Sequence, residues 1–491
     1  MKSPHAADEG ARTDQRELSK QAARGFGWVA MIRYTNRLTG FVTTLILAKF
    51  VAPDAFGLIA VATMVMELVN LMKDMGMSQA LIFRREQSAR TSSTAFFLLI
   101  CVNAVIVTTV CLSAPLLSAF FEDPSITPVV IVMSSSLLLF ALRSVPDALL
   151  RKEMAFSRLV IPSVVPAIVG SVVSIVMAVQ GFGVWSLVAR ALLVEGLSTI
   201  LIWKYSPFRP SLVFDTQVAR ELLSYGRYII GASIFGVCLY NIDRLYVGKM
   251  IDVSALGLYV LGYTLANVPV GELGHMVCRV MLPALSKVNE DLRIFREGLS
   301  KTLELSAMIS IALGVGIATF GPELVRSIFD EEWWPMARPL QVLAVAATFR
   351  SVSTLIAEAC KAIGSPQLVQ WTMLYRLIVV SILGFVGVYA FGILGLAWAI
   401  LIAYASAFAG EVFVLGPFVG MKPGDFFRVL IWPILLAVAA IPTSYWVTTL
   451  WADSDLLQLL VGGPLSVALF VVLVSQFRRR LIRTVWAATF S

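Results

Sequence analysis

Apolar runs long enough to cross a membrane recur along almost the whole chain. A spanning helix needs roughly 20 mostly apolar residues, and about fourteen segments qualify between residues 28 and 477. Short turns such as VAPDAFG and GFG separate many of them. The pattern predicts an all-α integral membrane protein with no long soluble insertion. The predicted spans are 28–50, 56–74, 93–114, 126–142, 160–180, 184–203, 224–248, 256–277, 302–321, 340–360, 367–390, 393–417, 427–448 and 458–477.

The composition supports the membrane class. The 491 residues are 58% hydrophobic and only 14% charged, with a mean hydropathy of +0.83. Soluble domains average about 45–50% apolar and about 25% charged residues. The five cysteines form no CxxC pair, so neither a disulfide framework nor a cysteine-based metal site is expected.

The distribution of Lys and Arg predicts the orientation of the spans. If the N-terminus is cytoplasmic, the inner tails and loops hold 27 of the 39 Lys and Arg residues, and the outer loops hold four. Residues 1–24 carry alternating charges and no apolar h-region, which predicts a cytoplasmic tail rather than a cleavable signal. Both termini are therefore predicted to be cytoplasmic. The net charge of +8 follows this topology and does not indicate nucleic-acid binding.

An internal repeat appears when the sequence is shifted by 200 residues. The segment 45–63, LILAKFVAPDAFGLIAVAT, then falls on 245–263, LYVGKMIDVSALGLYVLGY. Both cover a helix exit, an outer turn and the next helix entry. This register predicts two six-helix lobes related by a parallel pseudo-two-fold repeat around a central cavity. The predicted domains are a cytoplasmic tail 1–24, an N-terminal lobe 25–205, a C-terminal lobe 206–420, and two extra helices with a basic tail 421–491.

Charged residues also lie inside the predicted spans. A charge at the bilayer centre costs at least ~2.5–3.5 kcal/mol on insertion scales, so it usually faces a wet cavity or a partner. Those near span ends are expected to reach the membrane interface. The residues concerned are Arg33, Arg37, Glu67, Lys73, Asp74, Arg190, Glu195, Arg227, Asp243, Arg244, Glu272, Glu304, Arg350, Glu358, Arg376 and Glu411.

The first span carries the most informative pair. Arg33 and Arg37 are four residues apart and share one helix face, which Asn36 and Gly40 extend. Guanidinium groups bind phosphate through bidentate hydrogen bonds, so this face predicts an anion site in a polar cavity. The alternative for any single residue is charge pairing that fixes helix packing, for instance Arg37 with Glu67.

Three further spans carry polar faces at helical spacing. These faces are predicted to line the same cavity, either as polar groups or as ion-coupling groups. Their residues are Glu67 and Asn70 on the second span, Asp243 and Arg244 on the seventh, and Glu272 and His275 on the eighth. His275 with Cys278 could suggest a metal pair, but two groups do not make a site.

Several motifs resemble a known family. LAKFVAPDAFGLIAVATMV, followed by MGMSQALIFR, is similar to the first two helices of bacterial polysaccharide transporters, the polysaccharide branch of the multidrug/oligosaccharidyl-lipid/polysaccharide exporter superfamily. Further resemblances recur in order from about residue 25 to 420. They are LLRKEMAFSRL (149–159), GFGVWSLVAR (181–190), NIDRLYVGKMIDVSALGLYVLGY (241–263), LPALSKV (282–288) and KAIGSP (361–366).

The resemblance implies a flippase of the bacterial inner membrane. Such proteins move undecaprenyl-diphosphate-linked oligosaccharides to the periplasmic leaflet by alternating access, for exopolysaccharide, capsule or lipopolysaccharide synthesis. Cationic residues of helices 1, 2, 7 and 8 line the cavity in similar flippases, and Arg33, Arg37 and Arg244 lie in matching helices. Helix 2 departs from that pattern, because its central charge is the acid Glu67.

The same resemblance bears on partners and driving force. It implies a lipid-linked oligosaccharide and the bilayer as partners, with a polysaccharide polymerase and a chain-length regulator as further candidates. No cofactor is expected, and no ATPase motif is present in the sequence. Coupling to H⁺, to Na⁺ or to the membrane potential is left open.

Two other functions remain as alternatives. An ion-coupled multidrug exporter of the same superfamily would bind organic cations, which paired arginines disfavour. A membrane glycan polymerase or ligase would need catalytic groups on a long outer loop. The sequence holds no Ser/His/Asp set, Walker lysine or metal-ligand cluster, so a non-enzymatic transporter is predicted.

Overall fold

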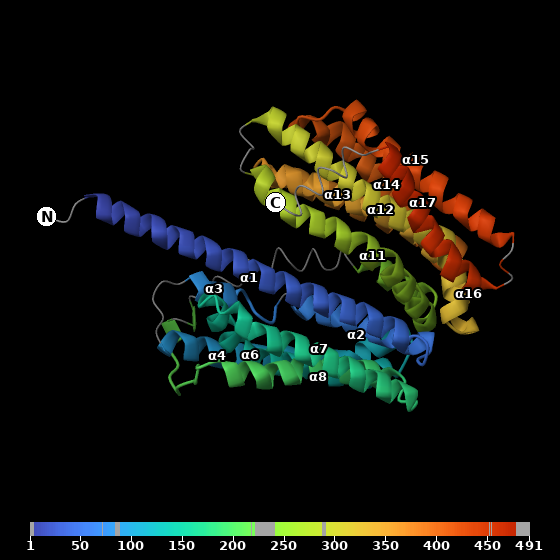
Figure 1. The fold of residues 1–491 in the computed structure, drawn as a ribbon. Helices are drawn as coiled ribbons and strands as arrows, with labels where there is room; N and C mark the ends of the chain where they lie inside the picture. Colours follow the sequence, from blue (N-terminus) through green and yellow to red (C-terminus); the bar gives the residue numbers. More distant parts are fainter. Residues whose placement is uncertain are drawn as a thin grey trace. The chain divides into compact units, whose positions relative to one another are not determined.

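The chain forms two helical units. The computed structural model describes residues 4–70, 72–83, 89–217, 219–220, 241–286, 291–450, 452 and 454–477. Every regular element within these ranges is a helix, so the predicted all-α class is confirmed. The two units are Met1–Asn241 and Ile242–Ser491 (Figure 1). The predicted pair of six-helix lobes and the boundary at 205/206 stay predictions.

The first unit contains eight described helices. In chain order they are α1 (Pro4–Leu47), α2 (Pro53–Asn70), α3 (Met77–Phe83), α4 (Ala89–Phe121), α5 (Ile126–Ser134), α6 (Ser136–Lys152), α7 (Phe156–Val179) and α8 (Val184–Tyr205). Helix α1 lies along α7, and α7 packs along α8 (Figure 1). Helix α6 contacts both α4 and α8. Buried apolar side chains, among them Leu99, Ala141 and Val145, form the core where α4 meets α6.

The second unit is built around α13. Its described elements are α10 (Ile242–Met250), α11 (Val253–Ser286), α12 (Leu292–Ile328), η1 (Glu331–Met336), α13 (Ala337–Ala362), α14 (Pro366–Gly410), η2 (Glu411–Leu415), η3 (Gly416–Val419), α15 (Pro423–Thr449), α16 (Asp455–Leu457), η4 (Gln458–Gly462) and α17 (Gly463–Phe477). Helix α13 packs against α11, α12 and α14, and α15 covers α12. The core is apolar, with Phe295, Ile356 and Phe426 nearly fully buried.

Helix α14 consists of two arms that meet without a loop. The backbone leaves helical geometry at Gly392, whose φ of 60° lies in the left-handed region that favours glycine. The arms then approach closely, because a Cβ at Gly387 would lie only 2.6 Å from the carbonyl oxygen of Gly395. The two predicted spans 367–390 and 393–417 are therefore one element joined at a glycine.

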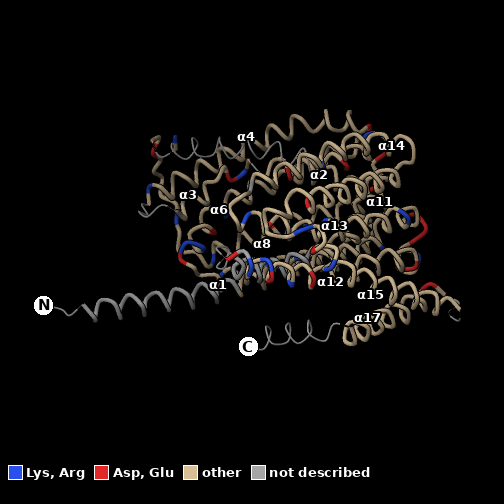
Figure 2. The backbone as a smooth tube through the Cα atoms, turned by 90° about the horizontal axis from the view of Figure 1, so that it is seen from above, with Lys and Arg blue, Asp and Glu red and all other residues tan. Residues whose placement is uncertain are grey.

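Eleven helical stretches are long and apolar enough to cross a membrane within the described residues. They match the predicted spans except at three places. The two arms of α14 fall within one stretch, α1 is not among them because Arg33, Asn36 and Arg37 lower the hydropathy of its apolar half, and span 224–248 lies largely outside the described residues. Figure 2 shows how thinly Lys, Arg, Asp and Glu are spread along the described helices. The exact number of crossings stays a prediction.

The repeat register is visible at one helix start in each unit. Helix α2 begins at Pro53 and α11 begins at Val253, which is the shift of 200 residues found in the sequence. In both places the preceding helix ends a few residues earlier, at Leu47 in α1 and at Met250 in α10. The turns predicted by the repeat are thus present in both units, and their outer position stays a prediction.

Candidate functional site

Arginine and asparagine side chains mark one face of α1. Arg33 and Arg37 are exposed on the first unit, whereas Asn36 is half-buried. The Oδ1 atom of Asn36 is buried and has no hydrogen-bond partner among the described residues. These three predicted site residues therefore share one stretch of a continuous helix, with the amide turned further into the bundle than the two cations.

Gly40 extends that face to a second helix. A Cβ at Gly40 would lie 3.3 Å from the Nη2 atom of Arg190, which is on α8. No other atom from a described neighbouring helix comes within 4 Å of that position. The missing side chain of Gly40 thus leaves the space that the Arg190 guanidinium occupies.

Arg190 is a third cation beside the α1 face. Its Nε atom is buried without a hydrogen-bond acceptor, and it forms no ion pair with any residue that the structure describes. Its backbone is held by a close approach of α7 to α8, where a Cβ at Gly170 would lie 3.3 Å from the Arg190 carbonyl oxygen. The helix is therefore fixed at this point, while the guanidinium retains unused donors.

The opposite side of α8 carries a charge that is paired. Glu195 accepts a hydrogen bond from Nε of Arg143 on α6 at 2.8 Å, and Nη2 of the same guanidinium forms an ion pair with that oxygen at 2.8 Å. The hydroxyl of Thr199, one turn further along α8, donates to the Leu139 carbonyl on α6 at 2.9 Å. This set has the features of helix packing, since a carboxylate and a guanidinium satisfy each other between two helices.

The charges that follow α2 also have local partners. The Ser78 hydroxyl donates to the Asp74 carboxylate at 2.5 Å, and the Ser144 hydroxyl donates to the same oxygen at 3.1 Å. The Lys73 ammonium lies 3.8 Å from the centroid of the Phe140 ring, within reach of a cation–π interaction. These contacts explain both charges by structure alone.

The predicted polar residues of α2 are placed differently from each other. Glu67 is half-buried and accepts a hydrogen bond from the Asn241 side-chain amide at 3.0 Å. Asn70 is exposed at the last position of α2. Asn241 lies 174 positions away in the sequence, so this contact joins α2 to the last residue of the first unit.

In the second unit, Asp243 and Arg244 occupy the first turn of α10. The Tyr259 hydroxyl on α11 donates to one Asp243 carboxylate oxygen, and the other oxygen accepts from the Arg244 backbone N–H at 2.9 Å. Both side chains are half-buried. Asp243 therefore links α10 to α11, and its predicted role in a cavity stays a prediction. The same holds for Arg244.

The predicted pair on α11 is only partly described. Glu272 and His275 fall within the helix, but their side chains lie outside the described residues. Close to them, Arg350 on α13 donates to the Tyr263 hydroxyl at 3.1 Å, and its Nη2 atom lies 3.2 Å from where a Cβ of Gly271 would be. An arginine thus occupies the space beside a glycine in this unit too, but here it has a phenol as partner.

The arginine of α14 is paired across a turn. Arg376 donates to Glu411 at 3.2 Å, and Glu411 is 1% exposed. The Arg376 guanidinium also lies 5.3 Å from the centroid of the Tyr404 ring. This buried pair joins the first arm of α14 to the segment that follows its second arm.

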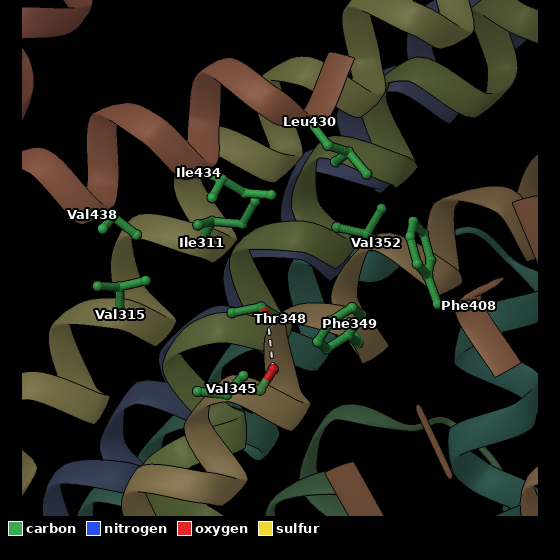
Figure 3. A pocket seen from close by; sticks show the side chains of 10 residues that line it. All are labelled: Ile311, Val315, Val345, Thr348, Phe349, Val352, Phe408, Leu430, Ile434 and Val438. Carbon is green, nitrogen blue, oxygen red and sulfur yellow. Dashed lines mark hydrogen bonds between the residues drawn. The ribbon is translucent and has the colours of Figure 1, made fainter. Parts of the chain in front are cut away.

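The second unit also contains an apolar cavity of about 190 Å³ (Figure 3). Four helices contribute its walls, namely α12, α13, α14 and α15. The single lining hydroxyl, that of Thr348, donates to the Val345 carbonyl within α13 and is not available to a ligand. A charged head group would find no hydrogen-bonding partner there. The lining residues are Ile311, Val315, Val345, Thr348, Phe349, Val352, Phe408, Leu430, Ile434 and Val438.

The described parts of the chain contain no candidate metal site. No group of three or more His, Cys, Asp or Glu side chains within those ranges is arranged to hold a metal ion. The charged groups described above are instead paired across helices or gathered along α1.

Comparison with protein families identifies the chain. Residues 46–338, more than half of its length, match the family described as polysaccharide biosynthesis protein. The chain belongs to this family. Its matched region begins near the end of α1 and runs through η1, so it includes parts of both units.

Two curated relatives show how this family member compares with others. It is 24% identical over 345 residues to the lipopolysaccharide biosynthesis protein WzxC of Escherichia coli (strain K12), covering 69% of each chain. It is 22% identical over 365 residues to the succinoglycan biosynthesis transport protein ExoT of Rhizobium meliloti (strain 1021), covering 73% of this chain and 72% of ExoT.

A solved structure shares the fold of this family member. The lipid II flippase MurJ in its inward closed conformation superimposes with a TM-score of 0.75 at 15% identity. The match covers 92% of this chain and 99% of the MurJ chain. At that identity the likeness establishes the fold alone, and it supports the multi-pass membrane architecture.

The candidate site contains one arginine, Arg190, to which the sequence analysis assigned no binding role. Arg190 was recognised only as a charge inside a span, because its position on α8 says nothing about which helix it faces. A weak signal was present: Gly40 continues the Arg33, Asn36 and Arg37 face, and a glycine on a polar face leaves room for a neighbouring side chain. Glu195 was recognised in the same way, and its partner Arg143 lies just beyond the predicted span 126–142.

Proposed function

We propose that this protein is a flippase for lipid-linked oligosaccharides in the synthesis of a surface polysaccharide. Its substrate is an undecaprenyl-diphosphate-linked repeat unit, which passes from the cytoplasmic to the periplasmic leaflet of the bacterial inner membrane. Both termini are cytoplasmic in this proposal, as the bias of Lys and Arg residues indicates.

The observation that carries the proposal is the cationic face of α1 in a polysaccharide-family membrane protein. Arg33 and Arg37 are exposed on α1, whose residues 38–47 are mostly apolar, and a third arginine lies beside Gly40. Guanidinium groups bind diphosphate better than any other side chain, because their planar donors match two phosphate oxygens at once. The names of the relatives WzxC and ExoT, which refer to polysaccharide biosynthesis and transport, are consistent with such a substrate.

The chemistry of the site assigns a task to each part of the substrate. The diphosphate meets Arg33 first when it arrives from the inner leaflet, and then Arg37, one turn deeper. The glycan follows through the polar region, and the prenyl chain stays in the hydrocarbon of the bilayer. No bond is made or broken, so the work of the protein is binding and a change of access driven by an ion gradient or by consumption of the product.

Deletion of the gene tests the function in the cell. A flippase mutant should lose the surface polymer and accumulate the completed lipid-linked oligosaccharide on the cytoplasmic side of the membrane. The measurement is extraction of lipid-linked sugars from the mutant, with lectin or enzyme access to intact spheroplasts reporting the leaflet. Complementation with the wild-type gene is the control.

Other outcomes of the deletion would contradict the proposal. Accumulation of single, unpolymerised repeat units on the periplasmic side would indicate a polymerase instead. An unchanged polymer together with greater sensitivity to cationic drugs would indicate a multidrug exporter.

A further inference from the structure

The starting observation is an arginine in a membrane helix that no described carboxylate neutralises. Arg190 lies on α8, seven residues into that helix, and is half-buried. A charged side chain within a span costs several kcal/mol unless it finds a partner or a wet cavity, so an arginine without a partner points to a ligand. The neighbouring charge on α8, Glu195, shows the opposite situation, since Arg143 satisfies it at 2.8 Å.

Two hydrogen-bonding atoms near this part of α1 have no partner among the described residues. The Nε of Arg190 is a buried donor without a described acceptor, and the Oδ1 of Asn36 is a buried acceptor without a described donor. Asn36 precedes Gly40, where a Cβ would lie 3.3 Å from the Arg190 guanidinium, by one helical turn. Buried polar atoms are almost always satisfied in proteins, so a donor and an acceptor left unused near the same part of α1 indicate a molecule that supplies both.

Arg190 on α8 lies at about the same depth in its predicted span as Gly40, which follows Arg33 and Arg37 on α1. Arg190 follows the start of α8 by six residues, or about 9 Å, and Gly40 precedes the end of α1 by seven residues, or about 10.5 Å. Both estimates place the guanidinium in the same outer part of the span. Along α1 the Gly40 level is only about 4.5 Å beyond Arg37, so one diphosphate can reach both cations.

We infer that Arg190 binds the anionic head group of the transported lipid, and that Asn36 beside it accepts a hydrogen bond from a hydroxyl of the attached sugar. This inference rests on the proposed function and adds to it a binding residue on α8. The ligand class is a prenyl diphosphate that carries a sugar, because it offers phosphate oxygens to Nε and Nη2 and a hydroxyl to Oδ1. Arg33, Arg37 and Arg190 then form one series of cations from the inner end of α1 outward.

A structural role for Arg190 makes a different prediction from a binding role. A structural arginine contributes to stability through its partners, and removing it lowers the unfolding temperature. Arg190 has no ionic partner among the described residues, so removing its charge should leave the unfolding temperature of the empty protein unchanged or higher. Only the binding of ligand should be lost.

The test measures ligand binding to the full chain purified in lipid nanodiscs. Undecaprenyl diphosphate is titrated and followed by native mass spectrometry, with inorganic pyrophosphate and the neutral lipid undecaprenol as parallel probes. We expect the wild-type protein to prefer undecaprenyl diphosphate over both. Arg190→Gln should lose about ten-fold or more in affinity, as expected when a charge-assisted hydrogen bond is removed. Arg190→Lys should recover part of it, because lysine keeps the charge but not the paired donors.

A steric variant tests the same contact with Arg190 left in place. Gly40→Leu fills the space beside α1 and displaces the guanidinium, since among the described neighbours on other helices only Arg190 comes within 4 Å of a Cβ at Gly40. It should weaken binding about as much as Arg190→Gln. Gly27→Leu on the same helix is the matched control, because no described neighbour lies within 4 Å of a Cβ there, and it should bind as the wild type does.

The outcomes separate this inference from the proposed function. Equal affinity of wild type and Arg190→Gln for undecaprenyl diphosphate would overturn the role of Arg190 and leave the flippase proposal standing. A wild-type preference for pyrophosphate over the lipid would overturn the assignment to a lipid head group. A large fall in the unfolding temperature of empty Arg190→Gln, with the ligand-induced rise retained, would show that the arginine is structural. The gene-deletion phenotype reports on the flippase function independently of all three.

Discussion

The two sides of α8 differ in whether their charged side chains are paired with another helix. On the side that faces α6, Glu195 and Arg143 meet at 2.8 Å, and a hydroxyl of the same helix bonds to α6 nearby. On the side that faces α1, Arg190 lies over Gly40 with a buried Nε that no described acceptor reaches. The two charges are five residues apart on α8, and both lie within the predicted span 184–203.

This difference separates two uses of charge in a membrane protein. A charge that meets its opposite on the next helix adds to the cohesion of the bundle and cannot also serve a ligand. A charge that remains unmatched destabilises the empty protein and keeps its donors for something that arrives. The comparison therefore predicts that variants on the α6 side lose protein, and that variants on the α1 side lose transport.

The largest effect is expected from the α1 side. Replacing both Arg33 and Arg37 by alanine should abolish export of the surface polymer while the protein stays inserted at normal levels, because the first contacts with the diphosphate are gone. Arg37→Lys should keep part of the activity, since bidentate geometry is lost but charge remains. The measurements are polymer at the cell surface and protein in the membrane fraction. Full export by the double variant would remove the anion site from the mechanism.

The Arg37→Ala variant alone tests whether the α1 side differs from the α6 side. If this protein disappears from the membrane, then Arg37 holds helices together as Arg143 does, and the α1 side would not differ from the α6 side. We expect instead that Arg37→Ala is inserted and inactive. Quantitative immunoblotting of membranes, paired with the export assay, distinguishes the two results.

A smaller effect, on stability, is expected from the α6 side. Arg143→Leu leaves the Glu195 carboxylate without its partner, and an unpaired group of this kind costs roughly 1–3 kcal/mol. Thermal unfolding of the purified protein should shift to lower temperature, while transport per inserted molecule stays near the wild-type rate. A variant with normal stability and no transport would place Arg143 in the substrate path instead.

A double-mutant cycle measures the coupling between Arg143 and Glu195. Glu195→Leu alone should also destabilise the protein, but the combination with Arg143→Leu should recover part of the loss, because two apolar side chains leave nothing unpaired between α6 and α8. The coupling between the two sites should be about 0.5–3 kcal/mol. Additive losses in the cycle would mean that the two residues act through different contacts.

The smallest change in stability is expected for Asn36→Ala. Its Oδ1 atom has no described partner, so little bonding is lost and the free energy of unfolding should change by less than about 0.5 kcal/mol. Export should fall without vanishing, because the cations remain. A marked loss of stability would show that the Asn36 amide has a packing role. Unimpaired export would show that a contact between Asn36 and a sugar hydroxyl is not needed for transport.

The sequence predicted the elements better than the contacts between them. Apolar runs of the right length identify membrane helices, and the starts of α2 at Pro53 and of α11 at Val253 follow the repeat found by inspection. The interruption of α14 at Gly392 falls between the predicted spans 367–390 and 393–417, but the direct joining of the two arms was not predicted, because hydropathy does not report how two spans are connected.

The candidate site was predicted on one helix and missed on the next. Helical periodicity placed Arg33, Asn36 and Arg37 on one face, since that requires only local geometry. It could not tell that Arg190 faces α1 while Glu195 faces α6, because the partner of a helix face is decided by packing between helices far apart in sequence. The hydrogen bond between Glu67 and Asn241 could not be predicted from the sequence for the same reason.

The close approach of Gly387 to Gly395 between the two arms of α14 has a consequence for the entropy of the second unit. Where Gly387 meets Gly395, the two arms touch through backbone atoms that have no rotamers to restrict. Ordering long side chains at a helix contact costs up to about 2 kcal/mol each, and this contact avoids that cost. It also contains no side chain whose rotamer could change, so the entropy of this contact comes from the backbone alone.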